Sequence, residues 1–310
     1  MAKLVQSLPI IEGSGCHDIG SWVTRNPGWQ RVLYQHGALL FRGFGITDTT
    51  SFDAVLNFLM QPTSTFAEET SPRSGLTSHV FTSTDYPPSF PIQFHHEFSY
   101  RRAYPERLAF CCIDPGIAGG ATPLADSRRV LNKIPRDVAD RFERLGVMYV
   151  RNYGELGVSW SESFGVTDKK VVSDYCRAQG IQFSWDGGYL QTRQVAPAVT
   201  THRVTAERAW FNSIVNLSIA GIEPADVREA MMSMPVDSLP VNTFYGSGEP
   251  IDPRVLNELK RIYEEEAIRF DWRAGDVLLI DNVLTAHARD PFEGPRSIIV
   301  AMGDAPTLMN

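Results

Sequence analysis

The stretch GDVLLIDNVLTAHARDPFEGPRSIIVAM, residues 275–302, contains the two strongest strand signals in the chain. Residues 276–281 (DVLLID) and 296–302 (RSIIVAM) are short apolar runs with several β-branched side chains. Runs of this length and composition, bounded by turn residues, are typical of β-strands. We therefore predict two strands near the C-terminus, joined by a segment that turns at Asp281-Asn282 and contains His287.

Three more strands and five helices are expected from the pattern of apolar residues along the chain. The strands are expected at residues 37–42 (GALLFR), 92–100 (IQFHHEFSY) and 107–113 (RLAFCCI). The last of these is apolar on both faces, which predicts a strand covered on both sides. The helices are expected at residues 50–61, 126–133, 136–145 and 168–179 (with Thr167 as N-cap of the last), and from Asp252-Pro253 onward with a buried stripe at Leu256, Leu259, Ile262 and Tyr263.

The order of these elements favours a mostly β fold with flanking helices. The elements do not alternate regularly as β-α-β units, so a β-sandwich or jelly roll with helical insertions fits better than a parallel doubly wound sheet. We expect residues 1–310 to form a single domain. Residues 147–212 mix aromatic residues with glycine and serine and are predicted to be a lid or insertion, and residues 63–90 are predicted to be a long loop.

Composition and charge exclude several classes of partner. The formal net charge of −7, from 29 Lys and Arg against 36 Asp and Glu, provides no basic footprint for nucleic acid. No apolar run approaches the roughly 20 residues needed to span a bilayer, and the N-terminus has no signal-peptide pattern. The four cysteines show no CxxC spacing, which favours reduced thiols and a cytoplasmic protein. We therefore expect a small-molecule partner, with neither nucleic acid nor a membrane involved.

The sequence His95-His96-Glu97 is a candidate for metal binding. Successive side chains of a strand point to opposite faces, so His95 and Glu97 share a face and His96 points away. With a distant histidine, such a pair forms the two-histidine, one-carboxylate triad of non-haem Fe(II) oxygenases, which leaves coordination positions open. Taken alone, the H-x-E pattern is a weak signal, and two half-buried polar residues on a strand are the favoured interpretation.

His287 is the candidate for the distant histidine, because it follows a strongly apolar strand and the turn at Asp281-Asn282. The alternative is a hydrogen-bonded residue at the end of a strand. The remaining histidines lie in contexts without a nearby acidic partner, and we expect them to be structural or exposed; they are His17, His36, His79 and His202.

Arg296 begins the last apolar strand and is a candidate for binding an anion. A buried charge is costly unless it is paired, and a guanidinium matches a carboxylate in a bidentate way. The partner is either an acidic side chain of the protein or the distal carboxylate of 2-oxoglutarate. Thr122, which follows Gly119-Gly120, could donate its hydroxyl to the same carboxylate; alone it would be an ordinary turn threonine.

Together these segments resemble the taurine dioxygenase and clavaminate synthase superfamily of Fe(II)/2-oxoglutarate oxygenases, which has a double-stranded β-helix (jelly-roll) core. The resemblance runs through HGALLFRGFGI (36–46), FHHEFSY (94–100), PERLAFCCIDPGIAGGATPLADSR (105–128) and GDVLLIDNVLTAHARDPFEGPRSIIVAM (275–302). The chain is most similar to the branch that includes the syringomycin-pathway aspartate hydroxylase, which it also resembles in RNYG (151–154), LQTRQVAP (190–197) and WFN (210–212).

The resemblance implies Fe(II) at His95, Glu97 and His287, and the 2-oxoglutarate carboxylate at Arg296 with help from Thr122. Many members carry Asp where Glu97 stands, but the most similar branch uses Glu.

The C-terminal block departs from the family pattern at one further position. Many members have a second arginine directly after the first, and this chain has Ser297 there. If the cosubstrate arginine belongs to that second position, Arg296 must bind the cosubstrate alone or from a shifted register, and Arg289 is the alternative.

The implied activity is hydroxylation of an unactivated C–H bond with O₂ as the second cosubstrate. The implied substrate is an amino-acid-like molecule, or a peptide or carrier-tethered intermediate, of natural-product biosynthesis. Desaturation and oxidative cyclisation use the same ligands and remain alternatives. The presence of Glu97 argues against halogenation, because halogenases of this superfamily have a small residue at that position.

Two alternatives belong to other classes of protein. One is a non-catalytic, metal-binding jelly-roll protein. The other is a Zn or Mn hydrolase with the same ligands, which has less support because no evident general base accompanies them and Arg296 would have no role.

The substrate contacts are expected beside the metal strand and in the 151–212 region. The candidates are Gln93, Ser99, Tyr100, Arg193 and Asn212. Arg193 is the best candidate for binding an amino-acid carboxylate. For each of the five, ordinary hydrogen bonding within the protein is the alternative.

Overall fold

The computed structural model describes residues 3–5, 8–13, 18–63, 67–68, 74–83 and 86–306. The predicted loop at residues 63–90 lies partly outside this part of the chain, and Cys16 and His17 lie wholly outside it.

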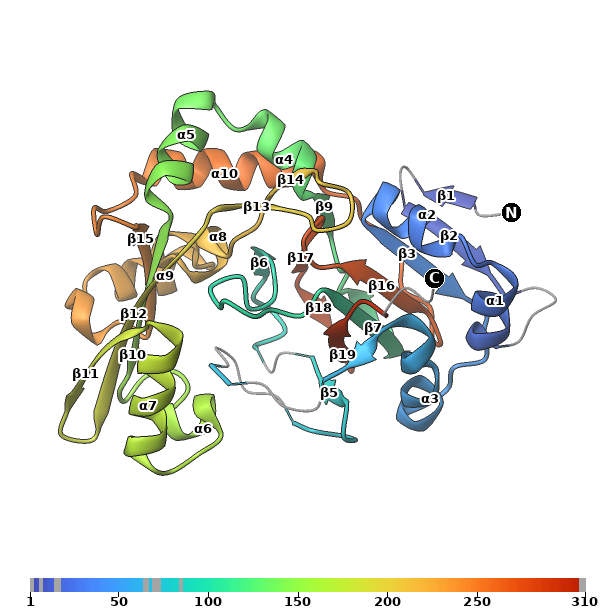
Figure 1. Ribbon diagram of the computed structural model, residues 1–310, viewed down its shortest axis with the longest axis horizontal. Helices are drawn as coiled ribbons and strands as arrows, with labels where there is room; N and C mark the ends of the chain where they lie inside the picture. The colour runs from blue at the N-terminus through green and yellow to red at the C-terminus, as the bar shows by residue number, and fades with distance from the viewer. Residues whose placement is uncertain are drawn as a thin grey trace.

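The largest sheet has eight strands and contains both predicted C-terminal strands. β16 (Val277–Asp281) and β19 (Ser297–Asp304) pair antiparallel with β7 (Arg107–Asp114), which lies between them (Figure 1). The other strands of this sheet are β1 (Lys3–Val5), β2 (Leu8–Glu12), β3 (Ala38–Arg42), β4 (Gln61–Pro62) and β5 (Val80–Thr82). The strands predicted at 37–42, 107–113, 276–281 and 296–302 are confirmed.

Burial on both faces explains the continuous apolar run of β7. Leu108, Phe110 and Cys112 belong to the core on one side of the sheet, whereas Ala109 and Cys111 belong to the core on the other side. A strand in this position has no solvent-facing side, so its sequence shows no polar alternation.

A three-stranded sheet faces the large one and completes the jelly roll. It consists of β6 (Ile92–His95), β17 (Thr285–Arg289) and β9 (Leu124–Asp126), with β17 in the centre. Phe94 and Ala286 pack into the same core as Phe110 of the large sheet. The predicted strand at 92–100 is too long, because β6 ends at His95 and residues 97–100 form a turn.

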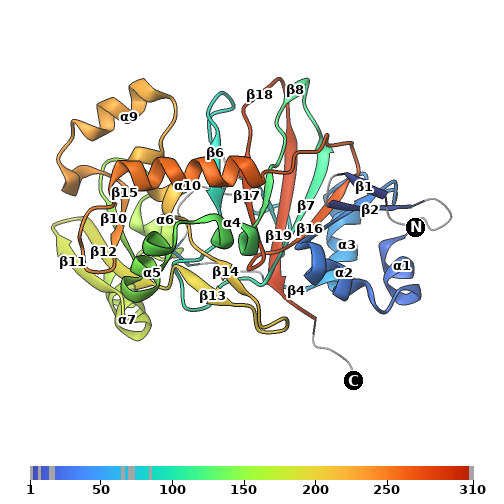
Figure 2. The same ribbon diagram turned by 90° about the horizontal axis from the view of Figure 1, so that it is seen from above.

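Three helices cover the outer face of the large sheet (Figures 1 and 2). They are α1 (Ile19–Arg25), α2 (Trp29–His36) and α3 (Thr49–Leu59). The helix predicted at 50–61 is confirmed by α3.

The helices α4 (Ser127–Lys133) and α10 (Pro253–Glu266) lie beside the three-stranded sheet, where both contact β9 (Figure 2). Helix α5 (Arg136–Leu145) packs its Phe142 against Trp210 and Tyr245. The predicted stripe of α10 is buried in the main core. All three helices were expected from the sequence.

A separate, four-stranded sheet forms the other end of the molecule (Figure 1). Its order is β11 (Gln182–Asp186), β12 (Tyr189–Ala196), β10 (Val147–Tyr153) and β15 (Val241–Tyr245). It is accompanied by α6 (Trp160–Phe164) and α7 (Lys169–Gln179). The predicted N-cap of α7 at Thr167 is wrong: Asp168 caps the helix by accepting from the N–H of Lys170.

Several short elements complete the described chain. They are β8 (Ala118–Gly119), β13 (Val199–Thr201), β14 (Arg208–Trp210), α8 (Ile214–Leu217), η1 (Ile219–Gly221), α9 (Ala225–Met232), η2 (Val236–Ser238) and β18 (Phe292–Glu293). None of the helices that the structure describes is long and apolar enough to cross a membrane.

Candidate metal centre and adjoining cavities

His95, Glu97 and His287 come together at one end of the jelly roll. One potential ligand atom from each lies within 4.8 Å of the others. Glu97 Oε1 is 3.6 Å from His95 Nε2 and 3.9 Å from His287 Nε2. Two imidazoles and a carboxylate at these distances are a donor set that suits Fe(II) and leaves coordination positions open.

Two neighbouring strands bring the histidines together. His95 is the last residue of β6, and His287 is its direct partner in the antiparallel pairing with β17. Glu97 lies just beyond the end of β6, yet its side chain is on the same side as His95. The pairing of β6 with β17 therefore brings together two histidines that are far apart in the sequence.

His96 points away from the site, as predicted. Its Nδ1 donates to the carbonyl of Asn212 at 3.1 Å, and the hydroxyl of Ser127 donates to its Nε2 at 2.7 Å. Burial lowers the pKa of His96 to about 3, so the ring is neutral. It is a structural histidine of the core.

The backbone of Gln93 sets the tautomer of His95. His95 Nδ1 lies 2.8 Å from the Gln93 carbonyl, which can only accept, so Nδ1 carries the proton. Nε2 is therefore the nitrogen with a free lone pair, and it is the one that faces Glu97. Histidines that bind a metal through one ring nitrogen commonly donate a hydrogen bond from the other, as His95 does here.

One cavity extends from the three residues to Arg296 and Thr122, which both line it. Burial, reinforced by the nearby Arg289, lowers the pKa of Arg296 to about 10, so the guanidinium is charged at neutral pH. Arg296 Nε donates to the Gly120 carbonyl at 3.0 Å, and none of the described carboxylates forms an ion pair with it. A half-buried cation without a carboxylate partner among the described residues favours an anion in the cavity.

The glycine at position 120 is required by this arrangement. Gly120 has φ +71°, and a Cβ at this position would lie 2.8 Å from Cδ and Nε of Arg296. A glycine here lets the arginine side chain lie against the backbone. This is a physical reason for the Gly-Gly pair before Thr122.

Thr122 is oriented to donate into the same cavity. Trp272 Nε1 donates to Thr122 Oγ1 at 3.1 Å, so the hydroxyl accepts on one side and its proton is available on the other.

Arg289 lines the cavity as well, but its guanidinium is engaged with backbone. It donates to the carbonyls of Tyr86, Pro87 and Phe90 at 3.0, 2.8 and 2.8 Å. Arg289 thereby holds the segment before β6 against β17, which leaves Arg296 as the better placed cation.

A second cavity of about 320 Å³ adjoins the first at His95 and Glu97. It shares Ile92, His95 and Glu97 with the first cavity. Of the predicted substrate residues, Gln93 and Tyr100 line it. Its size is sufficient for a small organic molecule.

The other three predicted substrate residues do not line either cavity. Ser99 Oγ is paired with Ser213 Oγ at 2.8 Å, and Asn212 is buried with its amide bonded to backbone. Arg193 is exposed on β12 and bonds to Gln191, so the expectation that it binds a substrate carboxylate is not supported by its position.

Residues that the sequence did not single out make up much of the second cavity. Polar groups come from Tyr86, Asn216 and Glu223, and apolar groups from the 217–241 segment. Only the folded chain brings this segment to the metal centre, since it has no motif and lies more than 100 residues from His95.

The comparisons with known proteins agree with this geometry. The chain matches the family described as Taurine catabolism dioxygenase TauD, TfdA family over residues 24–302. The dapdiamide synthesis protein DdaC of Enterobacter agglomerans is 34% identical over 276 residues, which is 88% of this chain and 84% of that protein. A clavaminate synthase-like protein of Arabidopsis thaliana, At3g21360, is 31% identical over 286 residues, 87% of this chain and 82% of that protein.

Solved structures support the fold. PvcB of Pseudomonas aeruginosa aligns over 96% of this chain and 86% of its own, with a TM-score of 0.56 and 15% identity. A second PvcB structure, described as an Fe, alpha-ketoglutarate dependent oxygenase from an isonitrile synthetic pathway, aligns over 96% of this chain and 86% of that chain, with a TM-score of 0.53 and 16% identity. The predicted jelly-roll fold and the predicted superfamily are confirmed. The chain belongs to the TauD/TfdA family and is an Fe(II)- and 2-oxoglutarate-dependent oxygenase.

Proposed function

We propose that this oxygenase hydroxylates an unactivated C–H bond of an amino-acid-like substrate in natural-product biosynthesis. The observation that carries the proposal is that two cavities share the wall formed by His95 and Glu97. One cavity has the cation and hydroxyl expected for 2-oxoglutarate, and the other is free for a substrate. This arrangement supports metal binding by His95, Glu97 and His287.

The cosubstrate end is assigned to Arg296 and Thr122. The guanidinium supplies the charge that the distal carboxylate needs, and the Thr122 hydroxyl supplies a further donor. When bound, iron and 2-oxoglutarate supply the oxidising power: O₂ is consumed, 2-oxoglutarate gives succinate and CO₂, and one oxygen atom goes to the substrate. The protein aligns the two molecules on opposite sides of one wall.

The substrate end combines polar and apolar surface. Gln93 and Asn216 offer hydrogen bonds, and Leu217 and Val241 offer apolar contact, whereas the Tyr100 hydroxyl already donates to the Glu68 carbonyl. Such a lining suits an amino-acid-like molecule, either free or as part of a peptide or a carrier-tethered intermediate. The name of the relative DdaC, a dapdiamide synthesis protein, supports a role in natural-product assembly.

The test is a turnover screen with free amino acids, short peptides and carrier-bound aminoacyl groups. Succinate formation coupled to a product heavier by one oxygen atom is the expected result. A product lighter by two hydrogen atoms would show desaturation or cyclisation instead. If the protein binds iron but consumes 2-oxoglutarate with none of the candidate substrates, a non-catalytic role is favoured.

A further inference from the structure

The side chain of Asn282 is fully buried and bonds to both backbone groups of Glu97. Oδ1 accepts from the Glu97 N–H at 3.0 Å, and Nδ2 donates to the Glu97 carbonyl at 3.0 Å. The second Nδ2 hydrogen goes to the Pro105 carbonyl at 2.8 Å. The partners determine the orientation of the amide, because an N–H only donates and a carbonyl only accepts.

These bonds replace the backbone hydrogen bonds that a neighbouring strand would make with Glu97. β6 ends at His95, and Glu97 lies in the turn that follows, where Phe98 has φ +52°. The amide of Asn282 exchanges an N–H and a C=O bond with one residue, as an opposite residue does in an antiparallel pair. The backbone of Glu97 is thereby held although it lies outside the strand pairing.

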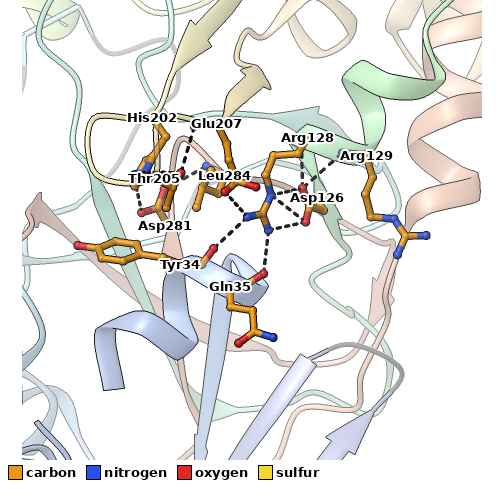
Figure 3. A network of polar contacts seen from close by, with 10 residues as sticks. All are labelled: Tyr34, Gln35, Asp126, Arg128, Arg129, His202, Thr205, Glu207, Asp281 and Leu284. Carbon is orange, nitrogen blue, oxygen red and sulfur yellow. Dashed lines mark hydrogen bonds and ion pairs between the residues drawn. The ribbon is translucent and has the colours of Figure 1, made fainter. Parts of the chain in front are cut away.

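Asn282 also links this turn to the strand that carries His287. It directly follows β16 and lies five residues before His287. The turn that contains Asn282 itself is held by Asp281. Asp281 accepts from the N–H of Leu284 at 3.0 Å and is bonded to His202 at 3.1 Å (Figure 3). The Asn282 amide therefore projects from a turn that is itself well anchored.

We infer that Asn282 is a positioning residue for the metal centre, which acts through Glu97. By holding the backbone of Glu97, it keeps the carboxylate in register with His95 and His287. Partners behind metal ligands typically change metal affinity by about 10–100-fold. Metal affinity is therefore the property that depends on Asn282, in addition to any effect on stability.

The test measures binding of Mn(II) to the metal-free protein by electron paramagnetic resonance. It needs no substrate and no O₂, so its outcome is independent of the reaction proposed above. We expect Asn282→Ala to lower Mn(II) affinity by about tenfold or more. The control is Asn152→Ala, which also removes an amide with two hydrogen bonds, to Leu239 and Gln191, but which lines neither cavity. It should leave Mn(II) affinity unchanged.

A double-mutant cycle separates positioning from stability. In Glu97→Ala the backbone groups that Asn282 binds remain, but the carboxylate is gone. Adding Asn282→Ala should then lower the unfolding temperature without any further loss of Mn(II) affinity. An equal loss of affinity in both backgrounds, or parental affinity in the single variant, would overturn the inference.

A variant that keeps the side-chain size covers the case in which Asn282→Ala does not fold. Asn282→Asp retains the acceptor for the Glu97 N–H and loses both donated bonds. It is also expected to lose Mn(II) affinity by about tenfold. If neither variant folds without metal, Asn282 belongs to the stability of the core and the inference fails.

Discussion

His287 lies directly opposite His95 in the antiparallel pairing of β17 and β6, and their ring centroids are 4.3 Å apart. One pair of opposite residues thus provides two of the three proposed iron ligands. Residues opposite each other in a ladder keep their separation when loops move, because the sheet holds them. The two histidines of the metal centre are therefore positioned by the jelly roll itself.

The first prediction concerns this pair. His287→Ala should lower Fe(II) affinity at least about tenfold and abolish 2-oxoglutarate turnover, since a single histidine and a carboxylate remain. Anaerobic addition of Fe(II) and 2-oxoglutarate should give a weak visible charge-transfer band with the parent protein and none with the variant. His79→Ala, which removes a histidine paired with Asp53, is the control and should retain the band. A band of parental intensity in His287→Ala would rule out the assigned ligand.

The second prediction concerns the cosubstrate. Arg296→Gln should raise the KM for 2-oxoglutarate by about tenfold or more, because a hydrogen bond between charged groups contributes about 1.5–3 kcal/mol. Steady-state succinate formation at varied 2-oxoglutarate measures this. Arg193→Gln removes an exposed arginine outside both cavities and should leave the KM unchanged. If only Arg289→Gln raised the KM, the assignment to Arg296 would be wrong.

The third prediction concerns a buried ion pair beside the second cavity. Arg151 Nη2 lies 2.7 Å from Glu68 Oε2, and both side chains are almost completely buried. Glu68→Gln leaves the guanidinium buried without its counter-charge and should cost about 3 kcal/mol or more in the free energy of unfolding. Urea denaturation measures the loss. Asp174→Asn breaks an exposed pair with Lys170 and should lower the free energy of unfolding much less, because solvent screens an exposed ion pair.

The fourth prediction concerns the thiols. Burial raises the pKa of Cys111 and Cys112 to about 12, and that of Cys176 to about 11. A raised pKa keeps each group protonated at pH 8, and the thiolate is the form that reacts. Iodoacetamide should therefore alkylate these three slowly in the native protein and rapidly in urea, as mass spectrometry of peptides would show. Equal rates in both conditions would contradict their burial.

The sequence predicted the core strands well, because their apolar runs follow from their position. β7 is covered on both faces, so nearly every residue from 107 to 113 had to be apolar. Strand alternation also separated His95 from His96, although the strand ends at His95, two residues before Glu97. The prediction still holds because the side chain of Glu97, just beyond the strand end, lies on the same side as that of His95.

The substrate side was predicted poorly, and the reason is physical. Arg193 and Gln93 look alike as polar residues in strands, and only the fold shows that one faces solvent and the other a cavity. The sequence predicts Asn282 only as a turn residue. Its bonds to Glu97 join segments 185 positions apart, so no local pattern indicates them. Long-range contacts of single polar side chains leave no local pattern.

The two cavities draw their walls from different parts of the chain. The wall around Arg296 comes mainly from jelly-roll strands, whereas much of the other wall comes from residues 213–241. Mutations that accumulate in that segment can alter which molecule is oxidised while the oxidising chemistry stays intact. The same separation lets an engineer exchange that segment between relatives and keep a working iron site, so divergence of substrate and retention of reaction become independent evolutionary steps.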